Sequence, residues 1–104
     1  MIPGTLEYLR GLAHTVQVPK HVAERARQRL LIDNPHQLKG KIVDAIKTLP
    51  CVRSYPHKRD EAMQVYVFDA QSMVWLIGWR RPDEHPVALT VIVRRAKNKF
   101  GPTG

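Results

Sequence analysis

The sequence is short of several residue types on which particular protein classes depend. It has one cysteine, Cys51, so an internal disulfide and a cysteine-rich zinc site are excluded. No apolar run approaches the roughly 18 residues that span a bilayer, and residues 1–7 do not resemble a signal peptide. Glycine-rich phosphate loops and paired catalytic carboxylates are also missing. We therefore expect a cytoplasmic protein with no membrane partner, no bound metal and no cofactor.

Acidic residues are too few to balance the basic ones. Seventeen Lys and Arg against nine Asp and Glu give a formal net charge of +8 and a sequence pI near 10.2. The excess is shared evenly, with eight basic and four acidic residues in 1–50 and nine and five in 51–104. Because the charge is spread through the chain, it favours a polyanionic partner, with nucleic acid ahead of a membrane. A basic protein without such a partner is the alternative.

The chain is expected to form a single domain covering all 104 residues, because 43% of them are hydrophobic. Helical periodicity dominates the first half. It predicts a helix that starts at Thr5 and ends before Pro19, and a second helix from Pro19 to about Ile32. A third helix is expected to follow the N-cap Asn34 and to run to about Thr48.

The second half changes to residues that favour strands. β-branched and aromatic side chains predict strands over residues 63–69, 73–79 and 87–93, with a weaker one around 52–55. The expected fold class is therefore α+β, with two to three N-terminal helices packed on a three- to four-stranded antiparallel sheet. A basic, mobile tail is expected from about residue 96.

The most informative pattern is a stripe of one imidazole and two guanidiniums. His21, Arg25 and Arg29 lie four residues apart, which places them on one face of the second predicted helix. Like charges at this spacing repel by roughly 0.2–0.5 kcal/mol, whereas Arg forks and a protonatable His suit a phosphate. The stripe is either a solvated basic face or a metal-free site for phosphodiester cleavage, in which His21 is the acid or base.

Thr90 is the second candidate site residue. It lies in the middle of the strand predicted at 87–93, where alternation puts it on one face with Ala88 and Ile92. Its hydroxyl could bind a phosphate oxygen, although a lone Thr in a strand is more often only a strand former. Basic residues at the end of this strand would track a nucleic-acid backbone; they are Arg94, Arg95, Lys97 and Lys99.

Arg80 and Arg81 end the strand that carries Trp75 and Trp79. A guanidinium beside an indole could sandwich an unpaired base, and both arginines are therefore candidate nucleic-acid contacts. We expect Trp75 to lie in the core, whereas the place of Trp79 is open. The basic run at residues 57–59 is equally consistent with a solvated turn and a contact.

The segment Lys20-His21-Val-Ala-Glu-Arg25-Ala-Arg-Gln-Arg29 resembles the HAxERxxxR helix of small bacterial and phage proteins. They belong to the barnase/EndoU/colicin/RelE-like (BECR) group. In that group the helix precedes a strand meander whose late strand carries a Thr-Val pair, the place taken here by Thr90-Val91. The sequence departs from the pattern where Leu30-Leu31 stands in place of the Gly that commonly follows the last Arg.

The resemblance implies a metal-independent ribonuclease, often a toxin, that cuts RNA through a 2′,3′-cyclic phosphate. It assigns His21 as the acid or base, Arg25 and Arg29 as phosphate ligands, and Thr90 as a polar site residue. A toxin of this kind would have a small acidic antitoxin or immunity protein as a partner. The alternatives are a non-catalytic basic module that binds nucleic acid or the ribosome, and a phage-type inhibitor of a host protein.

Overall fold

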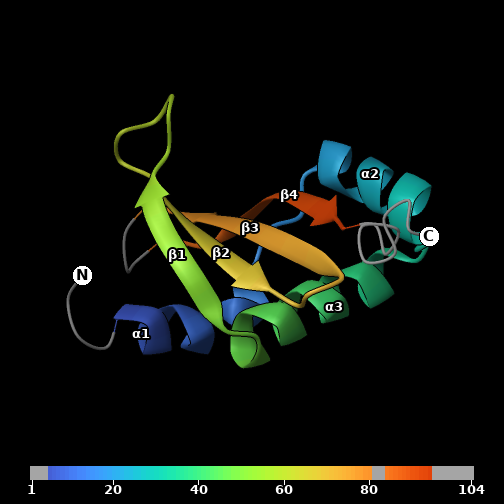
Figure 1. Ribbon diagram of the computed structural model, residues 1–104, viewed down its shortest axis with the longest axis horizontal. Coiled ribbons are helices and arrows are strands. Elements are labelled where there is room, and N and C mark those ends of the chain that lie inside the picture. The colour runs from blue at the N-terminus through green and yellow to red at the C-terminus, as the bar shows by residue number, and fades with distance from the viewer. Residues whose placement is uncertain (1–4, 81–83, 95–104) are drawn as a thin grey trace, which may run out of the picture.

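Three helices precede four strands in the computed structural model, which describes residues 5–80 and 84–94 (Figure 1). The helices are α1 (Thr5–Gly11), α2 (Lys20–Leu30) and α3 (Pro35–Thr48), with a short 3₁₀ helix, η1 (Ala13–Thr15), after α1. The strands are β1 (Cys51–Pro56), β2 (Gln64–Asp69), β3 (Met73–Trp79) and β4 (Val87–Val93). They form one antiparallel sheet in the order β1-β2-β3-β4, which confirms the predicted α+β class.

The start of α3 follows the expectation closely. The Asn34 side chain accepts hydrogen bonds from the backbone N–H groups of His36 and Gln37, at 2.8 and 3.2 Å, and Pro35 occupies the first helical position. At the other end, Arg10 of α1 donates to the carbonyl oxygens of Ile46 and Leu49 at 2.9 and 2.7 Å. A guanidinium at this position satisfies carbonyls that the helix itself leaves open and fixes α1 against α3.

The first helix is shorter than the periodicity predicts. It ends at Gly11, where the low helix propensity of glycine favours a break, and the chain then forms η1. Helix α2 begins at Lys20, with Pro19 as its N-cap rather than inside its first turn. These shifts move element ends by a few residues and leave the order of elements as expected.

The hydrophobic core lies between the helices and one face of the sheet. From the sheet it takes Phe68, Trp75, Ile77 and Val91, all at most 2% exposed. Helix α2 contributes buried residues from its apolar side, and α1, η1 and α3 close the rest of this face. In Figure 1, α1 and α3 lie below the sheet and α2 lies beside β4, and this arrangement decides which side chains of each strand meet solvent.

Trp79 belongs to this core and is not available to stack on a base. Its side chain is 3% exposed, and its ring lies 6.0 Å from that of Tyr8 in a stacked arrangement. Its indole Nε1 donates to the carbonyl oxygen of Glu84 at 3.0 Å, which satisfies the one polar atom of the ring. The predicted sandwich between Arg80 and an indole is therefore wrong, since Trp75 is also buried on the helix side.

The other face of the sheet carries a second apolar layer that no described helix covers. Val65, Val67 and Val74 are buried there, outside the helix-packed core. The register puts Arg53 and Tyr55 of β1 on the same face, opposite Val67 and Val65. We call this surface the open face. The loop between β1 and β2 projects beyond the end of the sheet (Figure 1).

A bulge in β4 changes which face Thr90 occupies. Leu76 pairs with Thr90 and Ile77 pairs with Ala88, so Leu89 is an extra residue between two consecutive pairs. The expectation that Ala88 and Thr90 share a face is therefore wrong. Ala88 faces the helices and is fully buried, whereas Thr90 lies on the open face and is half-buried. The bulge thus turns the Thr90 hydroxyl away from the core.

Candidate functional site

Helix α2 lies along the outer edge of β4. The Nε2 atom of His21 is 3.4 Å from the carbonyl oxygen of Leu89, and Nη1 of Arg29 donates to the carbonyl oxygen of Val91 at 3.4 Å. Both carbonyls point away from β3, where an edge strand leaves its backbone groups without a strand partner. The two ends of the stripe formed by His21, Arg25 and Arg29 are thus anchored on β4. We call this strip of surface the α2–β4 seam.

Gln17 extends the cover of the same edge. Its backbone N–H donates to the carbonyl oxygen of Pro86, and its carbonyl oxygen accepts from the N–H of Ala88, both at 2.9 Å. Together these form a short parallel bridge between Gln17 and Val87. The edge is therefore occupied from Pro86 to Val91 by the segment that leads into and includes α2, which explains how α2 is positioned.

Arg25 lies between the two anchors. It is exposed, and no hydrogen bond or ion pair connects it to any residue that the structure describes. Thr90 follows Leu89 and precedes Val91, so its backbone lies between the two carbonyls that the stripe contacts. The structure therefore places the backbone of Thr90 between the two contacts of the stripe, while the Thr90 side chain lies on the open face. A free guanidinium in such a place can bind an anion without first breaking an ion pair.

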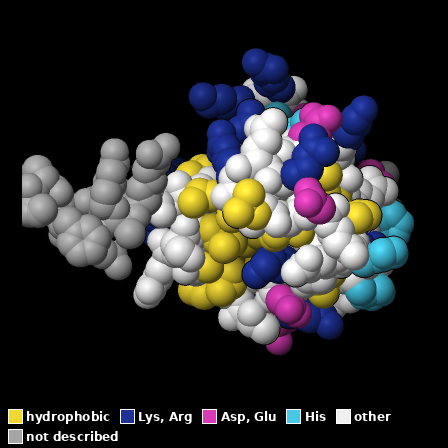
Figure 2. All heavy atoms as spheres, turned by 90° about the vertical axis from the view of Figure 1, so that its right-hand side faces the viewer, with side chains coloured by type: hydrophobic (Ala, Val, Ile, Leu, Met, Phe, Trp, Pro, Cys, Tyr) yellow, Lys and Arg dark blue, Asp and Glu magenta, His cyan; other side chains and the backbone are white. Residues whose placement is uncertain are grey.

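The exposed face of α2 is rich in basic side chains but is not purely positive. Lys20, Arg27 and the two stripe arginines are exposed, and Figure 2 shows several Lys and Arg side chains in the upper part of the face on which α2 lies. Away from the stripe, Glu24 lies with Lys20 and Arg27 in a separate surface hollow. The one acidic side chain of α2 thus lies apart from the stripe.

Two other predicted contacts are held in ion pairs. Arg80 meets Asp60 at 2.8 Å, and Arg94 meets Asp69 at 3.1 Å. The side-chain hydrogen bond from Arg80 lowers the pKa of the Asp60 carboxyl from its usual value. Both arginines remain about half exposed, at 49% and 52%, so a role in nucleic-acid binding stays a prediction for them. The remaining predicted contacts lie outside the described residues; they are Arg81, Arg95, Lys97 and Lys99.

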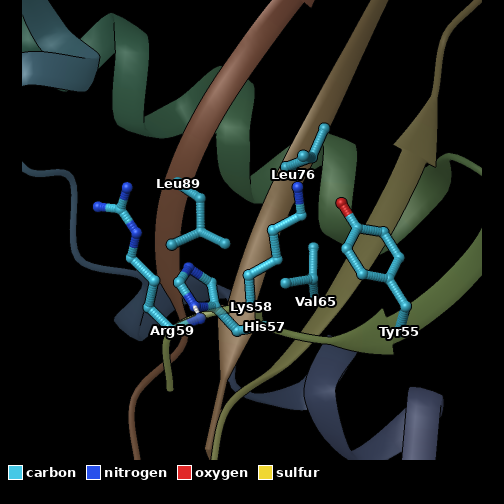
Figure 3. Close-up of a pocket in the computed structure, with 7 residues that line it drawn as sticks. All are labelled: Tyr55, His57, Lys58, Arg59, Val65, Leu76 and Leu89. Carbon is cyan, nitrogen blue, oxygen red and sulfur yellow. Dashed lines mark hydrogen bonds between the residues drawn. The ribbon is translucent and has the colours of Figure 1, made fainter. Parts of the chain in front are cut away.

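Sequence reasoning missed a hollow on the open face, beside the β1–β2 loop. It has a volume of about 320 Å³. Its lining joins the aromatic ring of Tyr55 and the basic run 57–59 to apolar side chains of β2, β3 and β4 (Figure 3). We call it the Tyr55 hollow. The available signal was a basic run that begins two residues after an aromatic residue of a strand, and only the folded sheet shows the apolar floor.

Among residues 5–80 and 84–94, no group of three or more His, Cys, Asp or Glu side chains could hold a metal ion. Within the same residues, no helix is both long and apolar enough to cross a membrane. Comparison with family models, with curated proteins and with solved structures found no match to this chain.

Proposed function

We propose that the protein is a metal-independent endoribonuclease whose site lies at the α2–β4 seam. The observation that carries the proposal is the position of Arg25, exposed and without a described partner between two anchored basic side chains. An unpaired guanidinium between these two side chains can meet the charge that grows on a phosphate during cleavage. The net charge of +8 supports a polyanionic substrate.

In this proposal the RNA supplies its own nucleophile. His21 accepts the proton of a 2′-hydroxyl, and the oxygen attacks the adjacent phosphorus. The bond from phosphorus to the 5′-oxygen breaks, which leaves a 2′,3′-cyclic phosphate, and the departing oxygen takes a proton from the imidazolium. Arg25 and Arg29 stabilise the charge on the phosphorane, and the Thr90 hydroxyl donates to a non-bridging oxygen.

The contacts of the stripe with β4 are compatible with this role. Both distances are 3.4 Å, longer than the usual 2.7–3.2 Å (about 2.9 Å at the mode) for N–H···O bonds. His21 and Arg29 are exposed, so each can turn from its carbonyl towards a phosphate at small cost. The carbonyls then meet water, which can take the place of the lost donor.

The test is cleavage of transfer RNA or total RNA by the purified protein in the presence of EDTA. We expect wild-type cleavage with 2′,3′-cyclic phosphate ends, and rate losses of about a hundredfold for Arg25→Ala and more for His21→Ala. Arg27→Ala on the same helix and His14→Ala in η1 are matched controls and should keep the wild-type rate. The proposal fails if the wild-type protein does not cleave RNA, or if His21→Ala cleaves equally well.

A non-catalytic nucleic-acid-binding module is the second candidate. It is favoured by one observation, which is that His21 and Arg29 already serve the fold by covering the edge of β4. Such a module would bind RNA with an affinity that falls steeply with salt and that survives His21→Ala. Binding measured at several salt concentrations, without cleavage of the bound RNA, would select this function.

A further inference from the structure

The Tyr55 hollow combines an apolar floor with a basic rim. The side chains of Val65, Leu76 and Leu89 form the floor, and those of Lys58 and Arg59 rise from the β1–β2 loop beside it (Figure 3). Among the residues that the structure describes, no carboxylate belongs to its lining. Its volume of about 320 Å³ lies at the lower end of the range for small-ligand sites. A flat apolar group attached to an anion would match both parts.

Tyr55 gives the hollow an aromatic wall. The guanidinium carbon of Arg53 lies 4.9 Å from the centre of the Tyr55 ring, a cation–π contact between two residues on the same face of β1. Arg53 itself is not part of the lining of the hollow. The ring therefore contacts Arg53 while it borders the hollow, and an aromatic ring is a platform on which an unpaired base can stack.

The rim is ordered by contacts within the loop. The Nδ1 atom of His57 accepts a hydrogen bond from the backbone N–H of Arg59 at 3.1 Å, shown as a dashed line in Figure 3. In the neutral ring the hydrogen then lies on Nε2, which is left as a donor. The ion pair between Asp60 and Arg80 ties the loop to the end of β3. These contacts hold the loop backbone that carries Lys58 and Arg59 beside the floor.

One residue connects the hollow with the α2–β4 seam. The side chain of Leu89 lines the hollow, and its carbonyl oxygen lies 3.4 Å from Nε2 of His21. Leu89 can make both contacts because it is the extra residue of the bulge: its side chain lies on the open face, and its carbonyl oxygen faces α2. The two surfaces are therefore neighbours, on either side of one peptide group.

From this geometry we infer that the Tyr55 hollow binds an unpaired nucleobase of single-stranded RNA, from the nucleotide next to the phosphate at the α2–β4 seam. The base stacks on Tyr55 over the apolar floor, and Lys58 and Arg59 meet the backbone phosphate of that nucleotide. The position of the phosphate rests on the proposed function, whereas base binding does not. Double-stranded RNA would be a poor ligand, because its bases are already stacked and paired.

The experiment measures binding of three fluorescent oligonucleotides of equal length: a single-stranded RNA, its abasic counterpart, and the same RNA in a duplex. A 2′-deoxy nucleotide at each cut position prevents cleavage during the measurement. We expect the single strand to bind about tenfold more tightly than the abasic strand, the effect of one base–aromatic stack. Tyr55→Ala should remove this difference and leave abasic binding unchanged.

Two further variants separate the hollow from the seam. Arg25→Ala should weaken binding of the single strand and of the abasic strand by the same factor, because it removes a phosphate contact only. The double variant Lys58→Ala/Arg59→Ala should weaken single-strand binding more than its matched control Lys39→Ala/Lys47→Ala, which removes the same charge from α3. Circular dichroism of each variant shows whether it is folded.

The outcomes for the two proposals differ. Equal binding of single-stranded and abasic RNA by the wild-type protein, or an unchanged preference in folded Tyr55→Ala, overturns the nucleobase site even if the protein cleaves RNA. A preference lost in Tyr55→Ala, in a protein that cleaves no RNA, supports the nucleobase site and rejects the ribonuclease. Failure to bind any of the three oligonucleotides overturns both.

Discussion

Nη1 of Arg29 donates to the carbonyl oxygen of Val91, and this contact joins the last turn of α2 to the outer edge of the last strand. The contact between Arg29 and Val91 shows that the stripe helps to cover the edge of β4. Without a cover, the free edge of β4 would offer its backbone groups to the strand of another molecule. Arg25, four residues earlier, has no such contact among the described residues, so substitutions can separate structural from functional effects within one stripe.

Arg29→Ala is expected to lower the free energy of unfolding by about 0.5–1 kcal/mol. The value is small for a hydrogen bond from a charged group, because the bond is long and partly solvated. Arg27→Ala, which removes the same charge from α2 without touching β4, should change stability by less than about 0.5 kcal/mol. Urea denaturation followed by circular dichroism measures both. Equal losses in the two variants would contradict the anchoring role.

Thr90→Val tests the hydroxyl without changing the shape of the side chain. Because Thr90 is half-buried on the open face and valine is a good strand former, the stability should stay within about 0.5 kcal/mol of wild type. The cleavage rate should fall by about tenfold or more if the hydroxyl donates to a phosphate oxygen. Rates are measured with saturating RNA in EDTA, and an unchanged rate would remove Thr90 from the site.

Leu31→Gly is expected to stabilise the protein by about 0.5–1 kcal/mol. Leu31 follows α2 in the left-handed conformation, with φ 57° and ψ 35°, and its side chain is 84% exposed. A side chain pays a steric cost there that glycine avoids, and little burial is lost. Leu30→Gly, inside the helix and partly packed, should instead destabilise. Thermal unfolding of the two variants would show opposite shifts, and a lower melting temperature for Leu31→Gly would refute the prediction.

Burial raises the pKa of the Cys51 thiol above its ordinary value of 9.0. As the pH rises, the unfolded chain therefore loses this proton before the folded protein does. The unfolded state then binds fewer protons, so the thiol lowers stability progressively above its unfolded pKa and has no effect at neutral pH.

Cys51→Ala should consequently lose less stability than wild type between pH 8 and about pH 10, as measured by urea denaturation at each pH. In the wild-type protein at pH 8, the thiol should react more slowly with Ellman's reagent when folded than in urea, because less thiolate is present. Equal rates in the two states would contradict the raised pKa.

Much of the fold could be predicted from local patterns. The Asn34-Pro35 pair indicated the start of α3, and the runs of β-branched and aromatic residues indicated β3 and β4 with their observed ends. Such signals are local, since a cap or a period involves residues within a few positions of each other. These local signals predict the correct element wherever the tertiary contacts favour the same conformation.

The site depended on contacts that no local pattern contains. His21 meets a carbonyl 68 residues away, and the bulge at Leu89 arises from pairing with β3 rather than from the alternation of β4 itself. The burial of Trp79 likewise depends on Tyr8 and on the carbonyl of Glu84. The spacing of the stripe could be predicted and the resemblance added Thr90 of β4 to it, but the carbonyls of β4 that it contacts and the neighbouring Tyr55 hollow could not be predicted.

The bridge between Gln17 and Val87 and the contacts of α2 with β4 join an early part of the chain to its last strand. During synthesis, α2 leaves the ribosome long before β4, and the strands β1 to β3 can pair while the seam is still absent. A nascent chain that stops before Val91 therefore has the stripe but not the surface on which it is aligned. For a protein proposed to cut RNA, this order of assembly would delay activity until translation of the domain is complete.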